Sequence, residues 1–122
     1  LDEIMQVMSA IGNHHEEHAD PATNVSAALI LADKADVHKS RVRNPSTVKF
    51  DIHDRVNYAV QKSQLQVIPE QNVIRLDLTV NTKISQVMEY FEIFLSRMVV
   101  SRRAADFLGS HYELAVNGNQ LM

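Results

Sequence analysis

Apolar residues recur along this chain at two different spacings, and the change of spacing divides the chain into two parts. Up to about residue 62 they recur every three or four positions, as on one face of a helix. From about residue 63 they alternate in steps of two, as in strands with one buried face, except for one long helical stretch. The sequence therefore predicts an α+β fold, with helices in residues 1–62, a ββαβ region with an antiparallel sheet in residues 63–122, and one shared core.

The first part predicts three helices. The first helix ends at the stop signal Gly12, and its apolar face consists of Ile4, Val7, Met8 and Ile11. The second helix is expected from about Val25 to Arg41, after a polar stretch that contains a proline. A short third helix begins after Asp51 and ends near Ser63.

The second part predicts a β-hairpin, a long helix and a further strand. Alternating apolar residues flank a turn at residues 69–72, which gives two paired strands. The long helix ends before Gly109, and its expected buried stripe is Ile84, Val87, Met88, Phe91, Leu95, Met98 and Val99. After a third strand, Asn117 and Gly118 form a turn signal that begins a last short strand.

Composition limits the classes of protein that this chain could belong to. With 122 residues, 45% of them hydrophobic and 22% charged, the chain fits one globular unit with a modest core. The chain has no cysteine, so a metal site would use His, Asp or Glu, and a reducing cytoplasmic location is expected. The net charge of −3 and the scattered Lys and Arg residues disfavour nucleic acid as a partner.

No stretch is apolar enough to predict a membrane span, so no membrane partner is expected. The chain starts at Leu1 and its first residues already have a helical pattern, without the layout of a signal peptide. We therefore expect that a segment upstream of Leu1 has been removed.

One group of residues has the composition of a metal site. His14 and His15 follow the first helix, and Asp33 lies on the second. Imidazole and carboxylate bind divalent Mn, Fe, Mg or Zn, and adjacent histidines could each serve a different ion of a two-metal site. The alternative is a solvated pair of histidines at a helix end, with Asp33 in a local ion pair.

Further residues near this group could take part in chemistry. His18 could donate a proton to a leaving group, although it also fits a solvated acidic loop. Arg41 and Arg43 could hold an anionic substrate, or could complement the end of the second helix. Asp36 lies one turn after Asp33 and could support a ligand or pair with a lysine.

The segments AIGNHHE at residues 10–16, VSAALILAD at residues 25–33 and RVR at residues 41–43 resemble the second half of the HD-domain metal-dependent phosphohydrolases. In that family an HH or HHE step ends one helix, and an Ala-Asp pair on the next helix supplies the last metal ligand. The resemblance implies that His14, His15 and Asp33 are ligands of one or two divalent ions. It also implies hydrolysis of a phosphate ester, such as a nucleotide or another phosphorylated small molecule.

The chain departs from the family pattern in one respect. The family has a histidine and a His-Asp pair upstream of the paired histidines, whereas none of the thirteen residues before His14 is a histidine. Three ligands bind metal weakly, so the ions could be absent from this chain, and we do not expect it to turn over substrate by itself.

Two hypotheses follow. In the first, the chain is the C-terminal portion of a cytoplasmic HD-type phosphohydrolase, and residues 63–122 are an accessory layer typical of some bacterial members. In the second, the chain is a non-catalytic regulatory or dimerisation module derived from an HD domain, in which the ββαβ region mediates association into a homodimer.

Overall fold

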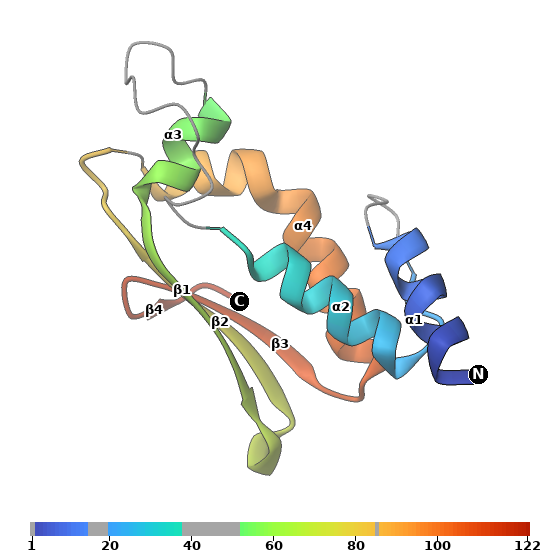
Figure 1. The fold of residues 1–122 in the computed structure, drawn as a ribbon. Helices are drawn as coiled ribbons and strands as arrows, with labels where there is room; N and C mark the ends of the chain where they lie inside the picture. Colours follow the sequence, from blue (N-terminus) through green and yellow to red (C-terminus); the bar gives the residue numbers. More distant parts are fainter. Residues whose placement is uncertain (1, 15–19, 38–51, 85) are drawn as a thin grey trace.

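A computed structural model describes residues 2–14, 20–37, 52–84 and 86–122 of the chain. Within these residues the fold is α+β, as the sequence predicts, and α2 and α4 lie on one face of a sheet (Figure 1). The helices are α1 (Asp2–Asn13), α2 (Asn24–Ala35), α3 (Ile52–Ala59) and α4 (Val87–Phe107). The strands are β1 (Val60–Ile68), β2 (Val73–Val80), β3 (His111–Val116) and β4 (Asn119–Gln120), with a 3-10 turn at Pro69–Gln71 between β1 and β2.

The sheet is mixed, which corrects the antiparallel sheet expected from the sequence. Among the described residues the strand order is β1-β2-β3-β4, and both β1–β2 and β3–β4 are antiparallel. The central pair β2–β3 is parallel, with Leu76 opposite Leu114. The reason is α4, a 21-residue crossover helix that returns the chain to the end of the sheet where β2 began.

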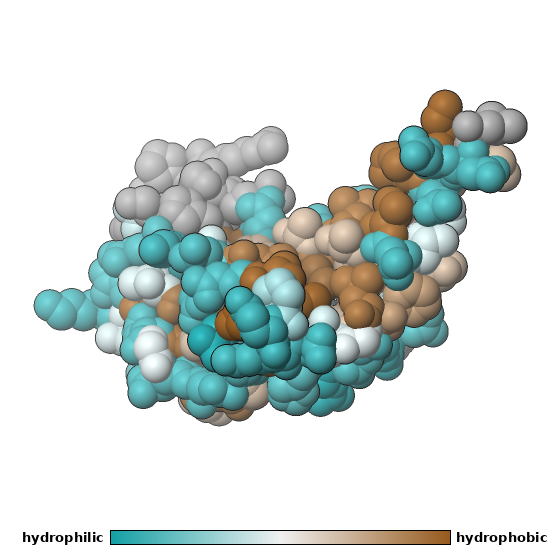
Figure 2. Space-filling view, turned by 90° about the horizontal axis from the view of Figure 1, so that it is seen from below, coloured by the Kyte–Doolittle hydropathy of each residue, from teal (hydrophilic) through white to brown (hydrophobic). Residues whose placement is uncertain are grey.

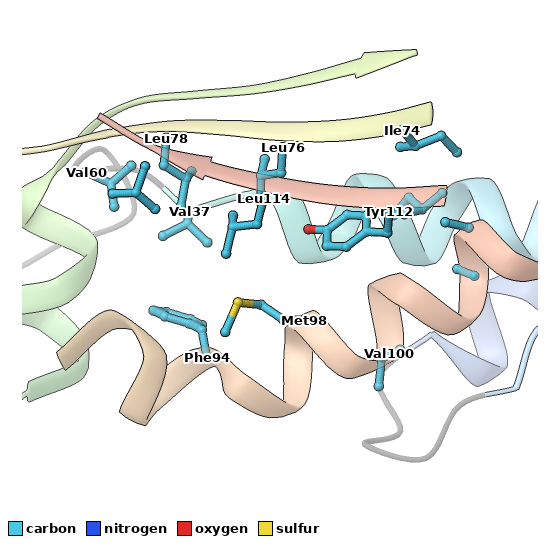
Figure 3. Close-up of a cluster of buried hydrophobic side chains, with 14 of the residues drawn as sticks. Val37, Val60, Ile74, Leu76, Leu78, Phe94, Met98, Val100, Tyr112 and Leu114 are labelled. Carbon is cyan, nitrogen blue, oxygen red and sulfur yellow. The ribbon is translucent and has the colours of Figure 1, made fainter. Parts of the chain in front are cut away.

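The core lies between the sheet and the helices that cover it (Figure 3). Every second residue of β2 and β3 enters it, and so do residues of α2, α3 and α4. The largest side chains less than 2% exposed are Ile30, Leu76, Leu114, Val37, Val56, Val60 and Val100. Tyr112 is also buried, and its side chain is hydrogen-bonded to Ser101. Burial raises the pKa of Tyr112 to about 12, so this ring enters the core uncharged.

Helix α4 buries part of the predicted stripe. Met98 is buried and Val87 and Phe91 pack against the core, as predicted, whereas Met88 and Leu95 are 72% and 59% exposed. Phe94 and Ala105, which the prediction left out, are buried. The buried side of the helix includes the small residues Ala104 and Ala105, which allow neighbouring elements to approach closely. No helix in the described part of the chain is both long and apolar enough to cross a bilayer.

Helix α2 ends at Ala35, before the expected end near Arg41. Asp36 has φ −79° and ψ 72°, which are not helical, and the chain then turns so that Val37 is 0% exposed. The Ser63 hydroxyl donates a 2.6 Å hydrogen bond to the carbonyl oxygen of Ala35. Because β1 satisfies this carbonyl and Val37 enters the core, the helix stops here.

Helix α3 is also shorter than predicted, because β1 begins at Val60. Val60 is 0% exposed and pairs with Val80, and a β-branched residue suits such a buried strand position. A register shift between Val60 and Lys62 keeps Val60 and Ser63 on the same face of the sheet.

The turn after β3 is hydrogen-bonded to the end of β2 through Asn117. Substitutions of Asn117 therefore test how much this contact stabilises the parallel pair. The backbone N–H of Asn117 donates to Leu78, and its side chain accepts from the N–H of Val80 at 2.8 Å and donates to its carbonyl at 3.1 Å. Asn117 and Gly118 have φ of +52° and +83°, as in a type I′ turn, at the position where the sequence predicts a turn.

We expect Asn117→Ala to lower the free energy of unfolding by about 2–4 kcal/mol, from two lost hydrogen bonds and a left-handed backbone. Asn117→Gly loses the hydrogen bonds but tolerates the backbone, so it should cost about 1 kcal/mol less. Urea unfolding of the two variants measures the difference. Equal stabilities would contradict the role given to the backbone.

Candidate functional site

His14 lies directly after the last residue of α1, where the sequence places it. Its Nδ1 is 2.6 Å from the carbonyl oxygen of Ile11, a residue of the last turn of α1. A neutral imidazole that donates through Nδ1 carries its lone pair on Nε2. The bond to Ile11 therefore orients the ring and favours the tautomer in which Nε2 could bind a metal.

Asp33 lies near the end of α2, on a helix whose position is fixed by its buried side. Thr23 caps the helix by accepting a 3.1 Å hydrogen bond from the N–H of Ser26. Ile30 and Leu31 enter the core, and the Asp33 side chain remains 27% exposed. The carboxylate is therefore held on a rigid element but is still accessible from solvent.

Asp33 is paired with its neighbour in the sequence. The Lys34 ammonium donates to Asp33 Oδ2 at 3.0 Å, and the Lys34 side chain is only 9% exposed. Burial by itself would raise the pKa of Asp33, but the hydrogen bond and the charge of Lys34 outweigh it, with further contributions from His14 and Arg97. The pKa of Asp33 is therefore lowered, and the group is an anion at neutral pH.

Two of the three predicted metal ligands, His14 and Asp33, lie in the described residues and interact electrostatically. The third ligand, His15, lies outside them, as do the predicted proton donor His18 and the predicted substrate-binding residues Arg41 and Arg43. Within residues 2–14, 20–37, 52–84 and 86–122, no three His, Asp or Glu side chains gather as a metal-binding group.

Arg97 of α4 is a residue near the site that sequence reasoning missed. Its guanidinium lies 5.0 Å from the centre of the Phe94 ring, and its charge lowers the pKa of Asp33. More than sixty positions separate Asp33 from Arg97 in the sequence, and only the packing of α2 against α4 brings them near each other. No local pattern could have revealed this, because Arg97 appears in the sequence only as a charge within an apolar stretch.

A small open pocket of about 330 Å³ lies beside α2, where the helix ends against β1. It is lined by Ala32, Ala35, Asp36, Val37, Ser63 and Leu65. Asp36, expected to support a ligand or to pair with a lysine, therefore lies on the wall of this pocket. Neither His14 nor Asp33 is among the residues that line it.

Comparisons of this chain with protein-family models, curated proteins and solved structures find no match.

Replacing Lys34 should change the pKa of Asp33 and the pH at which acid unfolding begins. Because the folded-state pKa of Asp33 lies below the ordinary value of 3.8, its ionisation stabilises the fold above that value. This stabilisation is lost as the pH falls through the folded-state pKa. In Lys34→Gln, burial is no longer offset by the ammonium, so the pKa of Asp33 should rise and acid unfolding should begin at a higher pH.

Carbon-13 NMR titration of the Asp33 carboxyl measures this pKa directly. Lys62→Gln, which removes an exposed lysine from β1, is the control and should leave the Asp33 titration unchanged. An unchanged Asp33 pKa in Lys34→Gln would show that the ion pair does not determine the charge of this carboxyl.

Proposed function

We propose that His14, His15 and Asp33 are ligands of a divalent metal site, and that the chain is part of a cytoplasmic phosphohydrolase of the HD type. The observation that carries this proposal is the packing of α1 against α2, which places His14, at the end of α1, and Asp33, on α2, within electrostatic reach of each other. The two segments that resemble the family are thereby brought together by the fold.

The chemistry of the two described groups fits a metal. The ring of His14 is oriented through Nδ1, and the supporting hydrogen bond to a backbone carbonyl is one that metal-binding histidines commonly make. Asp33 is ionised, as a metal ligand must be, and has a second oxygen besides the one bound by Lys34. Together with His15 they would hold Mn, Fe, Mg or Zn, either as one ion or as a pair.

A bound divalent ion would supply a hydroxide nucleophile at neutral pH and neutralise charge on a phosphate ester. The residues of this chain would orient the site and attract the substrate. Lys34 and Arg97 place positive charge around Asp33, which favours an anionic substrate over a neutral one. His18, Arg41 and Arg43 are proposed as the proton donor and the phosphate-binding residues. A nucleotide or another phosphorylated small molecule is the proposed substrate.

Manganese binding tests this proposal without requiring turnover. Electron paramagnetic resonance of free Mn²⁺, titrated with the chain, should give weak binding with a Kd of roughly 10 μM to 1 mM, as expected for an incomplete ligand set. His14→Ala and Asp33→Asn should each weaken binding by about tenfold or more.

His111→Ala is the matched control, because His111 is an exposed histidine at the start of β3 and should not affect binding. Circular dichroism establishes that each variant is folded. Equal Mn²⁺ affinity in the wild type, His14→Ala and Asp33→Asn would contradict the proposed ligands, and so would the absence of binding to the wild type.

A further inference from the structure

Helix α1 presents its apolar face to solvent instead of to the rest of the molecule. The exposed side chains are Ile4 at 60%, Met5 at 60%, Val7 at 46%, Met8 at 67% and Ile11 at 56%. Ala10 is the buried residue of α1, and the helix packs on α2 through this side. The strongly amphipathic helix is therefore attached by its small residue, with its large apolar residues facing outward.

This face, which we call the α1 stripe, consists of Ile4, Met5, Val7, Met8 and Ile11. In Figure 2, α1 projects at the upper right, and apolar side chains gather along it and on the adjoining surface. Single exposed apolar residues are ordinary on protein surfaces, but five on one three-turn helix form a contiguous patch. Such a patch marks an interaction site.

We propose that the α1 stripe binds the α1 stripe of a second copy of this chain, with the two helices antiparallel. In such a pair, a two-fold axis between Val7 and Met8 relates the two copies, and it matches four residues of the stripe, Ile4, Val7, Met8 and Ile11, with one another. In the antiparallel pair, Ile4 of one copy lies against Ile11 of the other, and Val7 lies against Met8. The face is thus complementary to itself, as an isologous dimer requires.

The charges of α1 favour this orientation. Its first turn carries Asp2 and Glu3, and its last turn carries no basic residue. A parallel pair would place four carboxylates together at one end, whereas an antiparallel pair separates the two acidic turns by about 18 Å, the length of a 12-residue helix. Antiparallel helix dipoles also attract each other.

The size of the stripe predicts a reversible dimer. Two such faces would remove on the order of 1,000 Å² from water, which is near the lower limit for a specific interface. A dissociation constant of roughly 1–100 μM is therefore expected. The interface does not depend on the proposed metal site, because the stripe includes neither His14 nor Asp33. It agrees with the homodimer of the second hypothesis, but it uses α1 instead of the ββαβ region.

Sedimentation equilibrium of the full chain between about 1 μM and 1 mM tests the dimer. We expect the average mass to rise from monomer to dimer over this range. Met8→Glu, at the centre of the stripe, should shift the transition at least tenfold toward the monomer. Met88→Glu is the matched control, because Met88 is 72% exposed on α4, outside the stripe, and should leave the transition unchanged.

Cysteine cross-linking tests the orientation, and the natural chain contains no cysteine to interfere. A mixture of the Ile4→Cys and Ile11→Cys chains should form a mixed disulfide dimer faster than either chain forms a disulfide with itself. Faster cross-linking of Ile4→Cys with itself would overturn the antiparallel arrangement. A wild-type monomer throughout the concentration range, with circular dichroism confirming folded helices, would overturn the dimer and indicate that another polypeptide segment covers the stripe.

Discussion

The burial of one face of the parallel β2–β3 pair beneath α2 and α4 is the constraint on which the rest of the structure depends. Leu76 and Leu114 lie opposite each other at the centre of this face, and both are almost fully buried. A parallel pair needs a long crossover, so the position of α4 follows from the sheet. The position of α4 in turn determines where α2 packs, because both helices contribute to the same apolar cluster.

The candidate site depends on this packing. Ile30 and Leu31 occupy the core side of α2, and the Asp33 side chain, at the margin of this side, remains 27% exposed. The same packing brings the charge of Arg97 near Asp33, while α1 brings His14. The proposed ligands are therefore held by helices whose arrangement is determined at the sheet. Damage to the core would affect the site even if no site residue were changed.

Much of the fold could be predicted from local patterns. The hairpin, the turn at Asn117 and the helical nature of the first part follow from spacing and turn residues, which act over a few positions. The parallel pairing could not be predicted in this way, because it depends on the path of a 21-residue helix. The buried face of α4 was predicted only in part: Met98 is buried as expected, but Met88 and Leu95 are exposed, because apolar residues lie on more than one side of the helix and the neighbouring elements decide which are covered.

In the site, too, some features depend on neighbouring residues in the sequence and others on contacts between distant segments. The position of His14 at the end of α1 is close to the predicted helix end, although Gly12 lies within α1 and is not among the glycines with a left-handed backbone. The approach of Arg97 to Asp33 depends on the packing of helices far apart in the chain. The outward orientation of the α1 stripe was also not predictable, since an amphipathic pattern indicates a face that must be covered without indicating which molecule covers it.

Native-state hydrogen exchange tests most directly whether α2 and the sheet form one cooperative core. If they do, the amides of Ile30 in α2, Leu76 in β2, Met98 in α4 and Leu114 in β3 exchange through the same global unfolding, with equal opening free energies and equal denaturant dependence. Exchange of α2 through a separate opening of lower free energy, while β2, β3 and α4 stay protected, would contradict a single cooperative core.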